Sequence, residues 1–382
     1  MALFKRRSLA APPVITDDAV PAGLKVAGAY SWRILAIVGV IAVFIFLVMQ
    51  FKYIVIPFMI AILIAALLVP LVQWLVRHKW PKALAVAVAM LGTIAIVSGL
   101  LYVVVTQIRS GWPDLQERSL KAYEDFRVFL ETSPLHVTDA QFNDWLDGAI
   151  ASIQADSQVL VSGALSVGST AGHVLAGLLL TLFATLFILI DGKGIWAWIV
   201  RLFPRKARPA IDGSGHAGWV TLTTFVKVQI FVAFVDAVGI GLGAWILGLI
   251  FGGFPLVIPI AIAVFLGSFI PVVGAVVTGA IAVFVALVYL GPFQALLMLA
   301  IVLLVQQIEG HVLQPLVMGT AVKVHPLAVV FAVAAGSFTA GIAGALFAVP
   351  IIAVLNVMVK YIASGEWRTN LRPTAKELLP RD

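Results

Sequence analysis

The sequence predicts an all-α polytopic integral membrane protein with about eight transmembrane helices, some of them broken or folded into hairpins. Hydrophobic residues make up 62% of the 382 residues and charged residues only 11%, whereas a soluble domain is roughly half apolar and a quarter charged. Several apolar runs reach the roughly 20 residues that one crossing requires. The chain has no cysteine, which excludes disulfides, thiolate metal sites and a cysteine nucleophile.

The first part of the chain is predicted to be a tail followed by three crossings. We expect residues 1–30 to be a cytoplasmic tail, because Lys5, Arg6 and Arg7 are followed by Pro, Ala and Asp and not by the apolar core of a signal peptide. Residues 31–106 hold the crossings, which are expected at 33–51, 53–75 and 83–106.

Residues 107–165 are predicted to form an amphipathic helical segment outside the cytoplasm. They contain nine acidic residues and four basic ones, which disfavours the cytoplasmic side, where basic loop residues gather. We expect the apolar face to pack on the membrane surface or on a neighbouring subunit, and a vestibule that gathers ligand is the alternative. Apolar residues recur at helical spacing at Trp112, Leu115, Leu120, Tyr123, Phe126 and Leu130, and again at Phe142, Trp145, Leu146, Ile150 and Ile153.

The transmembrane core is predicted at 166–361, with a basic cytoplasmic tail at 362–382. Residues 255–290 are expected to form two short helices around GSFIPVVG and to cross twice. Residues 327–361 are too many for one crossing, so this run is expected to fold back as a hairpin around GSFTAGIAG. The remaining crossings are expected at 167–190, 218–250 and 293–308.

Basic residues beside the apolar runs determine the predicted orientation. They gather in the N-terminal tail, in the loops at 76–82 and 191–212, and in the C-terminal tail. This pattern favours a multi-pass membrane protein with both termini in the cytoplasm. The same distribution accounts for the net charge of +7, so binding to nucleic acid is not expected.

Only four side chains between residues 213 and 359 carry a formal charge: Lys227, Asp236, Glu309 and Lys323. A charged group in hydrocarbon costs about 3 kcal/mol or more, so each is a functional candidate unless it reaches the interface. Lys227 is expected near enough to the cytoplasm to snorkel. Asp236 is too short to do so and lies about 900° further around the helix, on the opposite face. It therefore requires a proton or cation, a water-filled cavity or a partner helix.

The stretch QQIEGHVLQPL, residues 306–316, supplies the second candidate carboxylate, Glu309. If the helix continues through it, Gln306 shares its face, while Gln307 and Gln314 share another. These residues are candidates for transport or coupling. The alternative is a polar helix end in contact with the cytoplasm.

A weak internal repeat links the two expected hairpins. GSFIPVVGA begins at residue 267 and GSFTAGIAGA at residue 336, and both place Gly-Ser-Phe before a glycine-broken apolar run. Paired interrupted segments of opposite orientation mark substrate sites in secondary transporters, and close helix packing is the more ordinary role of such glycines. The first motif is expected at the cytoplasmic end of its hairpin and the second near the opposite end. The candidates for lining the path are Gly267, Ser268, Pro271, Gly274, Gly336, Ser337, Gly341 and Gly344.

Motifs of catalysis and nucleotide binding are absent from the sequence. It contains no GxxxxGK[ST], HExxH or GxSxG, so neither an enzyme nor a transporter driven by ATP bound to this chain is expected. His311 and His325 lack the Cys or paired His that a metal site requires. We therefore expect no metal and no cofactor.

The C-terminal third resembles the autoinducer-2 exporter family, the PerM permeases. The residues that carry the resemblance are Glu309 with Pro315, the pair His325-Pro326, and GIAGALFAVP at 341–350. The resemblance implies a membrane transporter that assembles as a homo-oligomer, expected to be a pentamer. It also implies export of the quorum-sensing signal autoinducer-2 in some members and sodium (or lithium)/proton antiport in others.

The leading hypothesis is a secondary transporter that exports a small polar signal molecule, similar to autoinducer-2, coupled to proton or ion movement. In it, Asp236 and Glu309 carry the proton or cation, and the glycine-broken hairpins line the path. A sodium(lithium)/proton antiporter is the first alternative, because it needs only a carboxylate that alternates between proton and cation. A membrane scaffold that transports nothing, or a channel, is the second. The expected partners are the lipid bilayer, the solute with a proton or sodium ion, and further copies of the chain.

Overall fold

The computed structural model describes residues 21–132, 167–270, 273–311 and 326–374. Every long regular element in these residues is a helix, and none is a strand. Within them, seven helices are long and apolar enough to cross a membrane, and two shorter apolar helices accompany them. The predicted all-α polytopic fold is therefore confirmed.

The chain divides into two units, Met1–Lys52 and Tyr53–Asp382. The first contains α1 (Ala22–Gln50), which begins before the predicted crossing at 33–51. Residues 34–50 of this helix contain no charged side chain, and its described side chains are almost all exposed. A helix of this kind matches hydrocarbon rather than water as its surroundings.

In the second unit, α2 (Lys52–Arg77), α3 (Lys82–Thr132) and α5 (Val167–Arg201) share one core. Alanines in that core allow the helices to approach closely. α3 does not end near residue 106 but runs on to Thr132 as one helix that includes Pro113. The buried members of the core are Ala65, Leu68, Val72, Leu75, Ala85, Val86, Ala89 and Leu189.

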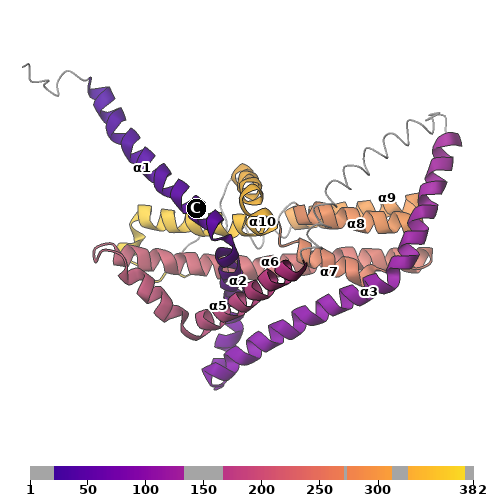
Figure 1. Cartoon of the computed structure of the whole chain (residues 1–382), viewed down its shortest axis with the longest axis horizontal. Coiled ribbons are helices and arrows are strands. Elements are labelled where there is room, and N and C mark those ends of the chain that lie inside the picture. Colours follow the sequence, from indigo (N-terminus) through magenta and orange to yellow (C-terminus); the bar gives the residue numbers. More distant parts are fainter. Residues whose placement is uncertain (1–20, 133–166, 271–272, 312–325, 375–382) are drawn as a thin grey trace, which may run out of the picture. The chain divides into compact units, whose positions relative to one another are not determined.

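α5 bends at Asp191, whose φ of −139° and ψ of 37° are not helical. The Gly194 N–H donates to Asp191 Oδ1 at 3.2 Å, so Asp191 caps the second half of the helix. The Ile190 carbonyl oxygen accepts a hydrogen bond from Lys82 Nζ at the start of α3. The bend (Figure 1) therefore attaches α5 to α3.

α6 (Arg208–Phe251) is the helix against which the C-terminal helices pack. Its 44 residues rise about 66 Å at 1.5 Å per residue, roughly twice the ~30 Å thickness of the hydrocarbon layer. Figure 1 shows α7 along one half of α6 and a long arm of α10 along the other half.

The half of α6 that ends at Phe251 packs against α7 (Val257–Gly267). Gly248 adjoins Phe254, and Gly241 adjoins Ala261, so the two helices run in opposite directions. α8 (Val273–Leu290) and α9 (Pro292–Ile308) complete this half of the unit. The core they share with α6 and α7 includes Ile240, Val264, Val285, Met298 and Val302.

The half of α6 that begins at Arg208 packs against α10 (Pro326–Ser364). Tyr361 adjoins Gly213, and Val354 adjoins Gly218. α10 is not one straight helix, because Ala340 and Gly341 have non-helical backbone angles and the helix changes direction there (Figure 1). The break that the sequence predicts within GSFTAGIAG is therefore present.

The α7–α8 hairpin lies within residues 255–290, which the sequence predicts to cross the membrane twice. α7 has 11 residues and rises about 16 Å, which is too short for a crossing of ~30 Å. Both open ends of the hairpin lie beside one point of α3, since Leu256 adjoins Gly111 and Tyr289 Oη donates to the Gly111 carbonyl oxygen at 3.5 Å. The two open ends of the hairpin therefore lie on the same side, and the double crossing stays a prediction.

The two glycine-broken turns lie together, and the expectation that they lie at opposite ends is wrong. Ile270, in the turn after α7, packs in one cluster with Val329, Val333 and Ala345 of α10. The reason is the length of the helices. α7 covers the half of α6 that ends at Phe251, and the second part of α10 covers the half that begins at Arg208. The two turns therefore approach each other near the middle of α6.

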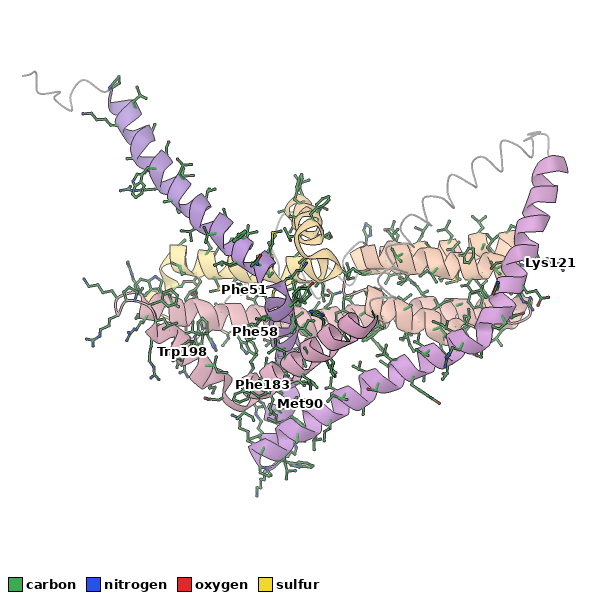
Figure 2. The ribbon with its side chains drawn as sticks, viewed as in Figure 1. Phe51, Phe58, Met90, Lys121, Phe183 and Trp198 are labelled. Carbon is green, nitrogen blue, oxygen red and sulfur yellow. The ribbon has the colours of Figure 1, made fainter. Side chains whose placement is uncertain are left out.

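Large apolar side chains remain on the outside of these helices. Phe58 on α2 and Phe183 and Trp198 on α5 are exposed and lie on the outside of the ribbon (Figure 2). In water so much exposed apolar surface would lead to association, whereas in a bilayer it matches its surroundings. The fold is that of a multi-pass membrane protein.

Candidate functional site

Three polar residues meet where the turn after α7 touches the middle of α6. Ser268 Oγ donates to Asp236 Oδ2 at 3.1 Å, and Gln229 Nε2 donates to the Ser268 carbonyl oxygen at 2.6 Å. Gln229 and Asp236 lie about two turns apart on one face of α6, so both face the turn. We call Gln229, Asp236 and Ser268 the polar cluster.

Asp236 is only 2% exposed. Its Oδ2 accepts the bond from Ser268, but its Oδ1 has no hydrogen-bond partner among the described residues. A buried carboxylate that stays charged and unpaired costs several kcal/mol. Glu309, which follows α9, lies close enough to act on Asp236 as a second negative charge. A proton or a small cation beside Oδ1 would relieve both costs.

The turn after α7 is closed by a pair of glycines. Gly267 and Gly274 lie backbone against backbone, so a Cβ at Gly274 would overlap the Gly267 carbonyl oxygen. The Ile270 N–H donates to the Gly267 carbonyl at 2.8 Å, and the Gly274 N–H donates to the Ile270 carbonyl at 2.9 Å. The predicted path residue Ser268 belongs to the polar cluster, whereas Pro271 lies outside the described residues.

The corner of α10 is built in the same way. Gly336 and Gly344 lie so close that a Cβ on either would overlap the carbonyl oxygen of the other. Gly341 has a φ of 61° and a ψ of −142°, a combination that side chains do not tolerate. Ser337 is exposed and donates only within its own helix, to the Val333 carbonyl at 2.8 Å. Gly267, Gly274, Gly336 and Gly344 thus serve close packing, whereas Gly341 serves the change of backbone direction. Ser337 does not join the polar cluster.

The end of α9 holds the remaining predicted candidates. α9 ends at Ile308, and Glu309 begins a π-helical turn over 309–311, a feature often found at functional sites. Gln306 and Glu309 are half-buried, and Gln307 is exposed. Gln314 lies outside the described residues. Glu309 is the member of this group whose negative charge repels that of Asp236.

Lys227 lies away from the polar cluster. Its side chain is exposed whereas that of Asp236 is buried, as their positions on opposite faces of α6 require. Among the residues that the structure describes, no three His, Cys, Asp or Glu side chains lie together as metal ligands do.

Gln229 is the member of the cluster that the sequence analysis missed. It is only 7% exposed, and a buried amide in hydrocarbon needs hydrogen-bond partners. A signal for it exists, because Gln229 stands seven residues before Asp236 and therefore shares its helix face. A search for charged side chains does not find Gln229, because its amide is neutral.

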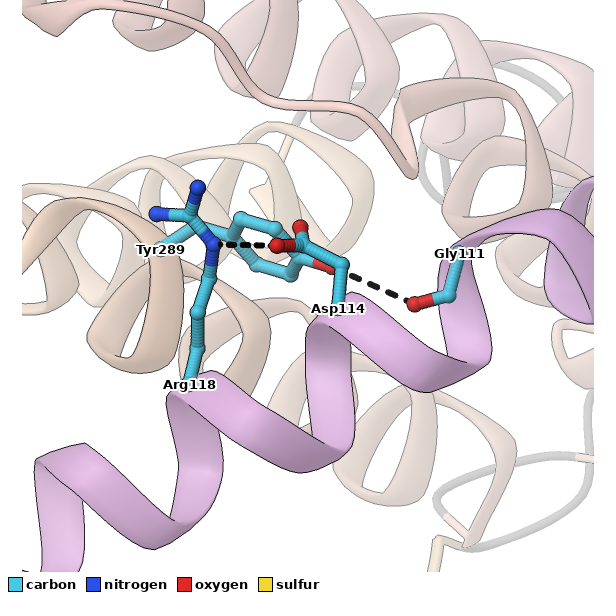
Figure 3. Close-up of polar contacts among 4 residues, drawn as sticks. All are labelled: Gly111, Asp114, Arg118 and Tyr289. Atoms are coloured by element: carbon cyan, nitrogen blue, oxygen red, sulfur yellow. Dashed lines mark hydrogen bonds and ion pairs between the residues drawn. The ribbon is translucent and has the colours of Figure 1, made fainter.

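A second group of polar residues lies where α3 meets the end of α8 (Figure 3). Arg118 Nε donates to Asp114 Oδ1 at 2.8 Å, and the Arg118 guanidinium lies 5.1 Å from the centroid of the Tyr289 ring, within cation–π range. Tyr289 also donates to the Gly111 carbonyl oxygen. These contacts hold the open end of the α7–α8 hairpin against α3.

The Asp114–Arg118 pair predicts that stability depends on pH at its acid limit. The hydrogen bond from Arg118 lowers the pKa of Asp114 below its ordinary value of 3.8. A carboxyl group with a lowered pKa stabilises the fold above the unfolded pKa, and this contribution is lost as the pH falls through the folded pKa. We expect the wild-type protein in detergent to unfold at a slightly higher temperature than Asp114→Asn above about pH 5, and this difference to vanish in stronger acid.

The matched control for this measurement is Glu117→Gln, a neighbouring exposed carboxylate on α3. The difference between wild type and Glu117→Gln should not show the same dependence on pH. A difference between wild type and Asp114→Asn that persists unchanged below the lowered pKa would contradict the assignment.

Proteins similar to this chain are transport proteins by name. Putative transport protein MT0215 of Mycobacterium tuberculosis (strain CDC 1551 / Oshkosh) is 38% identical over 350 residues, which are 91% of this chain and 94% of that protein. AI-2 transport protein TqsA of Escherichia coli (strain K12) is 25% identical over 323 residues, which are 82% of this chain and 87% of that protein. The family model described as AI-2E family transporter matches residues 34–364, which include both glycine-broken turns and the polar cluster. The chain belongs to the AI-2E family of transporters.

Proposed function

We propose that this protein is a secondary transporter that exports a small polar solute and uses Asp236 to bind the coupling proton or cation. A role in membrane transport follows from its family. The observation that supports Asp236 is its burial, at 2% exposed, with one carboxylate oxygen left without a partner among the described residues. One relative is named as an AI-2 transport protein, so a solute similar to autoinducer-2 is the first to test.

In this proposal the two broken turns act as gates on opposite sides of Asp236. The α7–α8 hairpin reaches the polar cluster from the end of α6 at Phe251, and α10 reaches the same level from the end at Arg208. Movement of one turn would expose the cluster to one side of the membrane, and movement of the other would expose it to the opposite side. Alternating access of this kind is how broken helices serve secondary transporters.

The proposal gives the other candidates secondary roles. Glu309 acts on Asp236, so it would tune binding of the coupling ion, with half-buried Gln306 beside it. Lys227 and Gln307 are exposed and would not touch the ion. We further propose that both termini face the cytoplasm from the inner membrane, because the predicted crossings place all the basic loops on one side, and that the subunits form a homo-oligomer, expected to be a pentamer.

Efflux from proteoliposomes tests the function. Vesicles that contain the purified protein and labelled autoinducer-2 are given a pH gradient of either direction. We expect one direction to accelerate efflux and the other to slow it, because a coupled step responds to the free energy of its ion. Efflux that ignores this gradient and an imposed sodium gradient, each in both directions, would identify a channel or facilitator instead.

A sodium(lithium)/proton antiporter is a second candidate, because the pair Asp236 and Glu309 contains the carboxylates that ion exchange requires. Vesicles without organic solute distinguish the two. If the proposed function is correct, an imposed sodium gradient moves no protons in such vesicles, as a pH-sensitive dye inside them would record. Proton movement driven by sodium or lithium alone would assign the antiporter.

A further inference from the structure

An apolar groove of about 530 Å³ lies between α3, α6 and α7. No polar atom is exposed on its walls. It lies on the face of α6 opposite to the polar cluster, because Phe234, Val238, Gly241 and Trp245 form one helical stripe and Asp236 is about half a turn away from it. The groove is therefore separate from the proposed transport site. Its other walls include Leu100 of α3 and Ile258 and Phe265 of α7.

The length of the groove matches one leaflet of a bilayer. Its lining on α6 runs from Phe234 to Trp245, which is about 16 Å of helix, and one leaflet has ~15 Å of hydrocarbon. α3 and α6 both contain segments that are long and apolar enough to cross the membrane. Water does not fill an apolar space of this kind, whereas an acyl chain from the surrounding leaflet fits its chemistry and its length.

The end of the groove at Trp245 has features suited to a phospholipid head group. Tryptophan rings concentrate at the level of the head groups, and Trp245 is 52% exposed. Gly111 of α3 adjoins Leu256, the residue before α7, so this part of α3 lies at the same end. Arg109 is exposed one half-turn before it and supplies a cation for a phosphate.

We propose that the groove binds one acyl chain of a membrane phospholipid, whose head group lies at the Trp245 end. Bound there, the chain fills the space between α7, α6 and α3 and braces the α7–α8 hairpin on the side away from the polar cluster. Such a lipid is a structural ligand, distinct from the mobile lipids that merely surround the protein. This inference stands independently of the transported solute.

Native mass spectrometry of the full chain, purified in mild detergent with added phosphatidylglycerol, tests the proposal. Val238→Trp places a large ring in the groove, and Leu242→Trp is a second variant that does the same should the first fail to fold. Val276→Trp on α8 is the matched control, because Val276 is 66% exposed and does not line the groove. Displacing several buried methylene groups of the acyl chain should lower lipid retention more than about tenfold.

The wild type and Val276→Trp should retain one phospholipid per chain at collision energies that remove the rest, and the groove variants should lose it. Equal retention by groove and control variants would show surrounding lipid only and overturn the proposal. A change in the number of subunits in the groove variants, with lipid retention unchanged, would overturn it as well, because the groove would then be an interface between copies of the chain.

Discussion

Replacement of Asp236 by asparagine is expected to abolish gradient-driven efflux while leaving the protein folded. Asparagine keeps the shape of the side chain and an oxygen that can accept from Ser268 Oγ, the bond that Asp236 Oδ2 accepts at 3.1 Å. It cannot take up or release a proton, and it removes the negative charge that attracts a cation. Coupled efflux should fall by at least about tenfold, which corresponds to 1.36 kcal/mol or more. Labelled efflux from proteoliposomes under an imposed pH gradient measures it.

Three measurements separate loss of coupling from loss of structure. Asp236→Asn should unfold in detergent at or above the temperature of the wild type, because an uncompensated buried charge is removed. Asp236→Glu should recover part of the gradient response, since it keeps a carboxylate one methylene away. Glu117→Gln removes an exposed carboxylate and should transport normally. Full gradient-driven efflux by Asp236→Asn would exclude this residue as the coupling group.

The helices of this protein were predictable because hydrocarbon imposes a simple rule on them. A run of apolar residues of the right length becomes a helix, and the breaks inside such runs follow from glycine. The bend of α10 at Ala340 and Gly341 falls within the motif that the sequence marks. Because charged residues are rare in this region, the sequence also indicated Asp236 as a candidate site residue. An acidic side chain in the middle of an apolar helix requires a special environment.

The arrangement of the two turns could not be predicted in the same way. An apolar run does not reveal where α7 stops, and its 11 residues determine where the turn after it meets α6. The shared level of both turns depends on contacts between distant segments, such as the packing of Ile270 against the cluster that contains Val333. The bond from Gln229 to the Ser268 carbonyl is another such contact, and it brings together residues that no local pattern connects.

Adding a methyl group at Gly274 is expected to destabilise the protein strongly, although alanine is the better helix former. The new Cβ would overlap the carbonyl oxygen of Gly267. The Cβ is fixed in place by the backbone and the oxygen belongs to it, so neither atom can rotate away. Opening the turn to make room would cost about 3 kcal/mol or more. It would also move Ser268 away from Asp236. Gly274→Ala should therefore unfold at a clearly lower temperature in detergent, and its folded fraction should lose coupled efflux.

Gly344→Ala extends the argument to α10, because a Cβ there would overlap the Gly336 carbonyl oxygen. Gly99→Ala on α3 is the matched control, since a Cβ at Gly99 meets nothing within 4 Å. That change should be neutral or stabilise the protein by up to about 1 kcal/mol through helix propensity alone. Equal unfolding temperatures for Gly274→Ala, Gly344→Ala and Gly99→Ala would mean that the two turns are not closed by backbone contact. The shared construction of the turns would then not explain why both lie near the middle of α6.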